Sequence, residues 1–164
     1  MKKPQSYPVE ISSTPDGFLL TTSQWVPRPI QEVFQFFSVE TNLETLTPEF
    51  VGFKVLGKST PTVGEGTLID YTIKLHGIPM KWTTQIESWE PGVRFTDTQL
   101  RGPYALWHHT HEFLIQDGGT LMRDKVLFKL PFGALGALLA GWMVKRDVRA
   151  IFEYRHQRVN SIFA

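Results

Sequence analysis

The stretch Trp107-His108-His109-Thr110-His111-Glu112-Phe113, followed by Asp117-Gly118-Gly119 and Met122-Arg123-Asp124-Lys125-Val126-Leu127-Phe128, decides the fold of this chain. Apolar and polar residues alternate on both sides of a short turn, which is the pattern of a β-hairpin. Because alternate side chains of a strand share a face, a two-residue turn at Asp117-Gly118 pairs His111 with Asp124 and Trp107 with Phe128. The face that carries large aromatic residues therefore also carries His109, His111 and Asp124.

The same alternation assigns the inner face of the neighbouring strands. A turn at Pro91-Gly92 pairs Trp82 with Arg101, and a turn at Gly77-Ile78 pairs Trp82 with Ile73. A two-residue turn at Gly102-Pro103 would reverse the faces, so we expect an odd-length connection or a β-bulge there.

The resulting inner face mixes aromatic with polar side chains. A solid core would not hold so many polar groups, since burying each one without a partner costs free energy. A water-containing pocket that opens at one end accommodates them. We therefore predict these ligand-binding residues: Tyr71, Trp82, Phe95, Asp97, Gln99, Arg101, Trp107, His109, His111, Phe113, Met122, Asp124 and Phe128.

The composition is that of an ordinary soluble globular protein, with 41% hydrophobic and 20% charged residues among 164. This length suits one domain, residues 1–164, with an ordered core from Gly17 to Phe163. A net charge of +1 argues against nucleic-acid partners. The chain has no cysteine, no apolar run long enough for a membrane span and no apolar segment typical of a signal peptide after Lys2-Lys3. We expect a cytoplasmic protein without a cofactor.

The chain divides into a strand, two short helices, a run of antiparallel strands and a long helix, which is an α+β layout. The first strand is expected at Gly17–Val26, and Pro27-Arg28-Pro29 ends it before a helix that begins at Ile30. A second short helix is expected at 39–46, and a long helix, around which the curved sheet wraps, at Gly133–Phe163. The other strands are expected at 50–56, 67–76, 80–89, 93–101, 104–116 and 120–130.

With these segments the chain resembles the START-like, or SRPBCC, superfamily, which has the helix-grip fold. It is most similar to small bacterial members that are grouped with polyketide cyclases and ligand-binding proteins. The resemblance implies a deep apolar cavity between sheet and C-terminal helix that binds a hydrophobic small molecule, and it carries no shared catalytic motif onto this chain. It spans nearly the whole chain and is carried by residues 27–34, 89–95, 102–104, 118–124 and 151–155.

His109 and His111 permit three chemical interpretations. They could ligate a metal ion together with Asp97 or Asp124. One of them, oriented by Asp124, could act as a general base, which makes His109, His111 and Asp124 the candidate catalytic residues. A His–Asp hydrogen-bond network could instead simply satisfy buried groups. Without cysteine and without a second ligand pair at fixed spacing, we favour the network and expect no metal.

The start of the long helix, residues 132–144, is apolar on nearly every side and precedes several basic residues. We expect it to pack on the two short helices. The alternatives are a mobile lid over the pocket and a membrane contact through Leu138, Leu139 and Trp142.

Three functional hypotheses follow. The first is a carrier or sensor of a hydrophobic small molecule, such as a lipid, a quinone or a polyketide-like compound. Arg101 would anchor a ligand carboxylate or phosphate, unless it pairs with Asp97 or lies at the rim in water. The second is an enzyme of the cyclase, dehydratase or lyase type that uses the His–Asp pair in the same cavity. The third is a membrane-surface protein that extracts a lipid.

Overall fold

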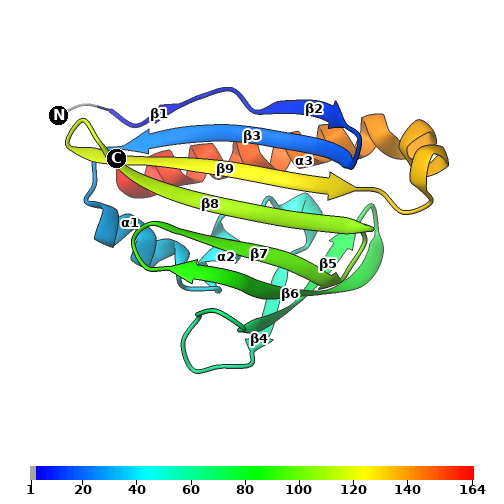
Figure 1. The fold of residues 1–164 in the computed structure, drawn as a ribbon, viewed down its shortest axis with the longest axis horizontal. Coiled ribbons are helices and arrows are strands. Elements are labelled where there is room, and N and C mark those ends of the chain that lie inside the picture. Colours follow the sequence, from blue (N-terminus) through cyan, green and yellow to red (C-terminus); the bar gives the residue numbers. More distant parts are fainter. Residues whose placement is uncertain (1–2) are drawn as a thin grey trace.

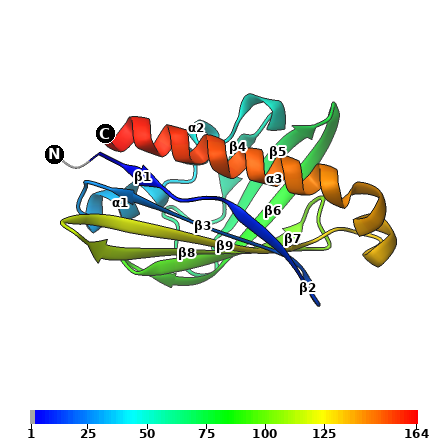
Figure 2. The ribbon, with the colours of Figure 1, turned by 90° about the horizontal axis from the view of Figure 1, so that it is seen from above.

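A curved antiparallel sheet and one long helix make up the two layers of the structure, which is a computed structural model describing residues 3–164. The helix, α3 (Gly133–Phe163), lies along the concave side of the sheet (Figures 1 and 2). Two short helices, α1 (Ile30–Phe37) and α2 (Asn42–Thr45), follow the first long strand. This is the α+β architecture expected from the sequence.

Nine strands form the sheet within residues 3–164, in the order β1-β3-β9-β8-β7-β6-β5-β4, with β2 also paired to β3. Every pair is antiparallel, as the short connections require for the hairpins. The strands are β1 (Gln5–Ser6), β2 (Glu10–Thr14), β3 (Gly17–Val26), β4 (Lys54–Lys58), β5 (Leu68–Leu75), β6 (Ile78–Glu90), β7 (Arg94–Arg101), β8 (Leu106–Gln116) and β9 (Gly119–Lys129).

Two stretches differ from the expected elements. The sheet begins at Gln5 rather than at Gly17, because β2 folds back on β3 through a two-residue turn at Pro15-Asp16. The single strand expected at 50–56 is replaced by a 3-10 turn, η1 (Glu49–Val51), and by β4. Gly52 separates these two elements with a φ of 54°, a left-handed conformation that glycine adopts at little cost.

The β8–β9 hairpin has the predicted register. His111 lies opposite Asp124, and Trp107 lies opposite Phe128. Asp117 and Gly118 form the turn, and both have positive φ, 52° and 75°, as a type I′ turn requires. The predicted inner face of the hairpin is therefore confirmed: Trp107, His109, His111, Phe113, Met122, Val126 and Phe128 are all buried.

The β5–β6 turn lies one residue earlier than expected. Leu75 pairs with Ile78, so His76 and Gly77 form the turn, with φ values of 50° and 82°. Trp82 therefore lies opposite Tyr71 instead of Ile73. Each residue of β6 therefore pairs two residues away from its expected partner in β5. Because side chains two residues apart share a face, the inner and outer faces of both strands are unchanged.

Two bulges in the β6–β7 pair correct the expected position of two side chains. Thr83 pairs with Arg101 while Thr84 pairs with Gln99, so one extra residue interrupts the alternation of β7. Arg101 consequently shares the outer face with Thr83 and is exposed, so the prediction that it faces the pocket is wrong. A second bulge between Ile86 and Ser88 turns Trp89 toward Phe95 and the core, although strict alternation along β6 would place Trp89 on the outer face.

The connection between β7 and β8 has the odd length that was one of the two expected solutions. Nine residues separate the paired positions Thr98 and His108, and this keeps Asp97 opposite His109. The Gln99 side chain donates a 2.7 Å hydrogen bond to the Tyr104 carbonyl and accepts one of 3.3 Å from the Tyr104 N–H. Gln99 thus closes this loop.

Two apolar clusters hold the layers together. Phe34 of α1 packs edge-on against Trp89, Phe95 and Phe113, with ring centroids 5.2, 6.0 and 5.2 Å away. The other cluster joins α3 to the sheet through Val148 and Phe152, which are almost fully buried against Val126 and Phe128. The two clusters fix both ends of the space between sheet and helix.

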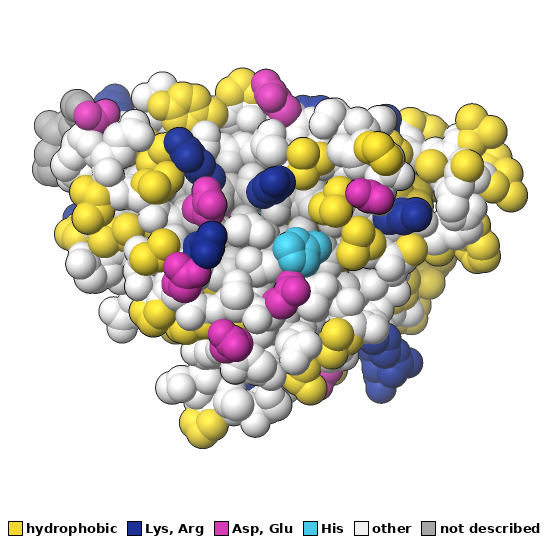
Figure 3. Space-filling view, viewed as in Figure 1, with side chains coloured by type: hydrophobic (Ala, Val, Ile, Leu, Met, Phe, Trp, Pro, Cys, Tyr) yellow, Lys and Arg dark blue, Asp and Glu magenta, His cyan; other side chains and the backbone are white. Residues whose placement is uncertain are grey.

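The first turns of α3 do not pack on the short helices as expected. Ala140 and Val144 contact the cluster that contains Phe18 of β3, near the β2–β3 hairpin. The larger apolar residues point away from the protein, and Figure 3 shows hydrophobic side chains gathered at the end of the molecule where α3 begins. The exposed residues are Phe132 (85%), Leu135 (61%), Leu138 (79%), Leu139 (69%) and Trp142 (65%).

Replacing Phe34 by alanine should lower the free energy of unfolding by about 3–5 kcal/mol, because it removes the ring that ties α1 to three aromatic residues. Urea denaturation followed by circular dichroism measures this change. Phe50→Ala is the matched control, since Phe50 is 47% exposed and should cost less than about 1 kcal/mol. Equal losses for the two variants would contradict the packing described here.

Candidate functional site

A cavity of about 120 Å³ lies between the inner face of the sheet and α3. Its wall is mostly apolar and is polar at one side, where Asp97, His109 and His111 meet Arg155 of α3. The other lining residues come from the strands, from α3 and from the segment that contains the short helices. They are Phe37, Ser38, Glu40, Leu43, Thr47, Val51, Phe53, Val63, Ile69, Tyr71, Trp82, Thr84, Ile86, Phe95, Tyr104, Trp107, Ile151 and Phe152.

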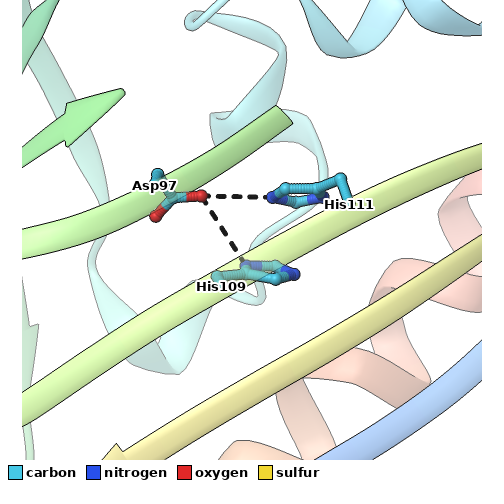
Figure 4. Close-up of side chains that lie close together, drawn as sticks. All are labelled: Asp97, His109 and His111. Carbon is cyan, nitrogen blue, oxygen red and sulfur yellow. Dashed lines mark hydrogen bonds and ion pairs between the residues drawn. The ribbon is translucent and has the colours of Figure 1, made fainter. Parts of the chain in front are cut away.

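Two histidines and two aspartates form a hydrogen-bonded network at the polar side (Figure 4 shows three of them). His109 donates from Nε2 to Asp124 Oδ1 at 2.7 Å, and His111 Nδ1 lies 3.1 Å from the same oxygen. His111 Nε2 donates to Asp97 Oδ2 at 3.2 Å. The two imidazole rings lie with centroids 3.6 Å apart, because His109 and His111 are alternate residues of one strand.

The two histidines of this network have opposite charge preferences. Burial by itself would lower the pKa of His111, but its hydrogen bonds to Asp124 and Asp97 outweigh burial and raise the pKa above the ordinary value. Burial and the neighbouring His111 lower the pKa of His109 to about 4. The network therefore favours the charged form of His111 and the neutral form of His109.

The carboxylates stay ionised despite their burial. Burial opposes their ionisation, but the hydrogen bond from His111 lowers the pKa of Asp97, and hydrogen bonds from both histidines hold the pKa of Asp124 well below its usual range. A positive charge on His111, together with that of Arg155, would balance the two negative charges of Asp97 and Asp124.

Arg155 is the functional residue that sequence reasoning missed. Its Nη1 lies 3.9 Å from Asp124 Oδ1, and its guanidinium carbon lies 4.8 Å from the Phe152 ring centroid. Its Nε and Nη1 are buried without a hydrogen-bond partner. The spacing of the residues could have identified it. Val148, Phe152, Arg155 and Val159 follow one another at intervals of four, three and four residues, which places Arg155 on the buried face of the helix.

The structure brings together seven of the thirteen predicted ligand-binding residues around the cavity: Tyr71, Trp82, Phe95, Asp97, Trp107, His109 and His111. Asp124 is not among the cavity residues, but its Oδ1 contacts one ring nitrogen of each histidine. Phe113, Met122 and Phe128 belong to the packed clusters. Gln99 closes a loop, and Arg101 lies on the outer face with Lys81 and Asp70.

Other buried polar residues of α3 have structural partners. His76 Nε2, at the β5–β6 turn, lies 2.6 Å from Asp147 Oδ2, which ties that turn to the helix. Gln24 of β3 donates to the His156 carbonyl at 2.8 Å and to the Asn160 side chain at 2.7 Å. These contacts set the position of α3 over the sheet and so the height of the cavity.

Solved structures share this fold, whereas no family model and no curated protein sequence matches the chain. Ms6760 of Mycobacterium smegmatis has a TM-score of 0.66 at 15% identity, over 94% of this chain and 97% of that one. CV1439 of Chromobacterium violaceum has a TM-score of 0.68 at 12% identity, over 92% and 98%. Ara h 8.0201, a Bet v1-type allergen, has a TM-score of 0.58 at 18% identity, over 87% and 97%.

The fold is therefore the helix-grip fold of Bet v1-like and START-like proteins, as the resemblance implied. At these identities the likeness shows the fold alone, and a fold does not define a function. Within residues 3–164, none of the helices is both long and apolar enough to cross a bilayer.

One further match concerns part of a larger enzyme. A nucleoside-diphosphate sugar epimerase from Corynebacterium glutamicum is 28% identical, with a TM-score of 0.55 over 80% of this chain. This chain covers only 28% of that protein, so the likeness is to one portion of it.

The charge assignment predicts two distinct titrations. The His111 ring should stay protonated above pH 6.5, whereas the His109 ring should stay neutral down to about pH 4. Side-chain ¹⁵N chemical shifts of chelator-treated protein report both. The raised pKa of His111 stabilises the folded protein below about pH 6.5, and this contribution to the free energy of unfolding is lost as pH rises through the pKa of the folded state. His109 has the opposite effect. The folded protein favours its neutral ring, so its contribution is present above about pH 6.5 and is lost as pH falls. Two rings that titrate together near pH 6.5 would contradict the assignment.

Proposed function

We propose that the protein binds a hydrophobic small molecule, of the lipid, quinone or polyketide-like kind, in the cavity between the sheet and α3, as a carrier or sensor. One observation supports this most directly: the largely apolar cavity is lined by two residues, Trp82 and Arg155, that carry buried N–H groups without hydrogen-bond partners. Trp82 Nε1 and two nitrogens of Arg155 are buried without a hydrogen bond. Buried donors without partners are rare and costly, and a ligand oxygen would satisfy them.

Arg155 takes the anchoring role that the sequence assigned to Arg101. A guanidinium is always charged and presents a planar set of donors that matches a carboxylate. Arg155 is only 8% exposed, so it meets a ligand where water competes little. A ligand with an acidic or carbonyl head beside Arg155 and an apolar body against Trp82 and Tyr71 fits this wall.

The cavity volume limits the part of the ligand that enters without rearrangement. An engineered apolar cavity of about 150 Å³ binds benzene. A cavity of about 120 Å³ therefore holds one ring or a short acyl segment. A longer ligand would have to displace side chains of the short helices, such as Phe37 and Leu43, which form part of the wall.

Phenylacetate and its neutral counterpart phenethyl alcohol test the anchor, because both offer one ring and differ in charge. We expect phenylacetate to bind the wild type roughly 10–100-fold more tightly, since a hydrogen bond to a charged group contributes about 1.5–3 kcal/mol. Quenching of tryptophan fluorescence measures this, because Trp82 and Trp107 line the cavity. Native mass spectrometry of protein purified from its own host identifies the natural ligand.

The matched variants are Arg155→Met and Arg101→Met. The first should abolish the preference for phenylacetate and the second should keep it, because Arg101 lies on the outer face. Failure of both compounds to bind, or a preference that survives in Arg155→Met, would exclude the proposed binding mode.

For the enzyme hypothesis, the geometry favours His109 over His111. Both ring nitrogens of His111 face carboxylates, Asp124 at 3.1 Å and Asp97 at 3.2 Å, so neither is free for a substrate. His109 Nδ1 lies 3.9 Å from Asp97 and makes no hydrogen bond to it. A cyclase, dehydratase or lyase acting in this cavity would therefore use His109 as its base, with Asp124 orienting the ring.

A membrane-surface role is supported by the exposed residues at the start of α3. Leu138, Leu139 and Trp142 form an apolar surface next to the exposed cation Arg146, whose guanidinium carbon lies 5.5 Å from the Trp142 ring centroid. Apolar side chains flanked by basic ones match an anionic lipid surface, where the apolar part enters the headgroup boundary.

The variant L138S/L139S/W142S should bind anionic vesicles of phosphatidylglycerol and phosphatidylcholine at least roughly tenfold more weakly than the wild type, as each lost apolar group removes buried area. Flotation at low and high salt measures this. Ile115→Ser is the control, because Ile115 is 77% exposed but belongs to β8. A wild type that does not float with these vesicles would remove the hypothesis.

A further inference from the structure

The geometry points to a binding site for one divalent transition-metal ion, held by Asp97, His109 and His111 at the polar side of the cavity. One ligand atom from each of these side chains lies within 4.8 Å of the others. The three side chains converge from two adjacent strands, β7 and β8 (Figure 4). Two nitrogen ligands and one carboxylate oxygen form a donor set that zinc and non-haem iron use in proteins.

The distances between the ligand atoms match a metal centre. Asp97 Oδ2 lies 3.2 Å from His111 Nε2 and 3.9 Å from His109 Nδ1. Ligand atoms at about 2.1 Å from a tetrahedral ion are separated by roughly 3.4 Å. The two separations from Asp97 lie on either side of this value, and the two imidazole nitrogens lie within 4.8 Å of each other, so a small rearrangement of the three side chains would complete the site.

Asp124 supplies the second observation. Its Oδ1 lies 2.7 Å from His109 Nε2 and 3.1 Å from His111 Nδ1, so one carboxylate oxygen accepts from the two nitrogens that do not face Asp97. Metal-ligating histidines usually donate their second N–H to a carboxylate, which fixes the tautomer and the ring orientation. Here a single buried aspartate orients both rings for an ion on the cavity side.

Three protein ligands leave at least one coordination position open, and the ligands line the cavity. An ion with two positive charges, together with Asp97, Asp124 and Arg155, gives the site one formal positive charge. A carboxylate of a bound ligand, or a metal-bound hydroxide, would neutralise it. The nitrogen ligands argue for a transition metal over Mg²⁺ or Ca²⁺, which prefer oxygen.

Cobalt titration of chelator-treated, full-length protein tests the site. We expect one Co²⁺ per chain, with the strong visible absorption of a four- or five-coordinate ion, and displacement by Zn²⁺. Elemental analysis of protein from its own host then identifies the native metal. The variants H109Q, H111Q and D97N should each weaken Co²⁺ binding at least roughly 100-fold, and D124N roughly 10–100-fold.

His108→Gln is the matched control, because His108 lies on the same strand but bonds Glu87 on the outer face. It should bind Co²⁺ like the wild type, and circular dichroism shows which variants are folded. A wild type that binds neither Co²⁺ nor Zn²⁺ more tightly than H109Q, or an H108Q variant that loses as much affinity as H109Q, would overturn the site.

The metal site does not depend on the proposed small-molecule ligand. Arg155→Met removes the anchor for phenylacetate but leaves the three metal ligands in place, so it should still bind one Co²⁺. Metal-free wild type, in turn, should still prefer phenylacetate to phenethyl alcohol. Loss of one property without the other therefore shows which of the two proposals fails.

Discussion

The register of the β8–β9 hairpin is the constraint on which the rest of the structure depends. It places His109 and His111 on the buried face and Asp124 directly opposite His111. A shift of one residue in this pairing would put Asp124 on the face opposite to His109 and His111 and bring Arg123 or Lys125 next to them instead. The polar groups thus enter the interior as a matched set, and Asp124 can serve both imidazoles because they lie next to each other on one strand.

The long helix completes the site from the opposite side. Val148, Phe152 and Val159 attach it to the two apolar clusters, and Arg155 lies among them on the same buried stripe. A lone arginine at this depth would be too costly without an opposite charge, and Asp124 at 3.9 Å supplies one. No direct hydrogen bond joins them, so the guanidinium keeps unpaired N–H groups for something that enters the cavity.

The sequence predicted what depends on local pattern and missed what depends on tertiary arrangement. Asp117-Gly118 fixes the turn, and the turn fixes the partners of His109 and His111, so this part of the site was predictable. A single bulge reversed the face of Arg101, and no pattern in β7 marks the extra residue. Arg155 was missed because the buried face of a helix is identified from the spacing of its apolar residues, and an arginine at the same spacing is not counted. The cavity residues of the short helices depend on how these helices fold across the sheet.

The cavity wall is chemically divided, and this division gives a ligand a direction. Asp97, His109, His111 and Arg155 gather charged groups at one side, whereas the rest of the wall is mostly rings and aliphatic side chains, with Ser38, Glu40, Thr47 and Thr84 as further polar members. We expect a molecule with one acidic end to bind with that end at the side where Arg155 lies. The same polar side also holds the three candidate metal ligands, so an ion there would meet the polar end of the molecule. The network and the cavity would therefore act on the same few atoms of the proposed ligand.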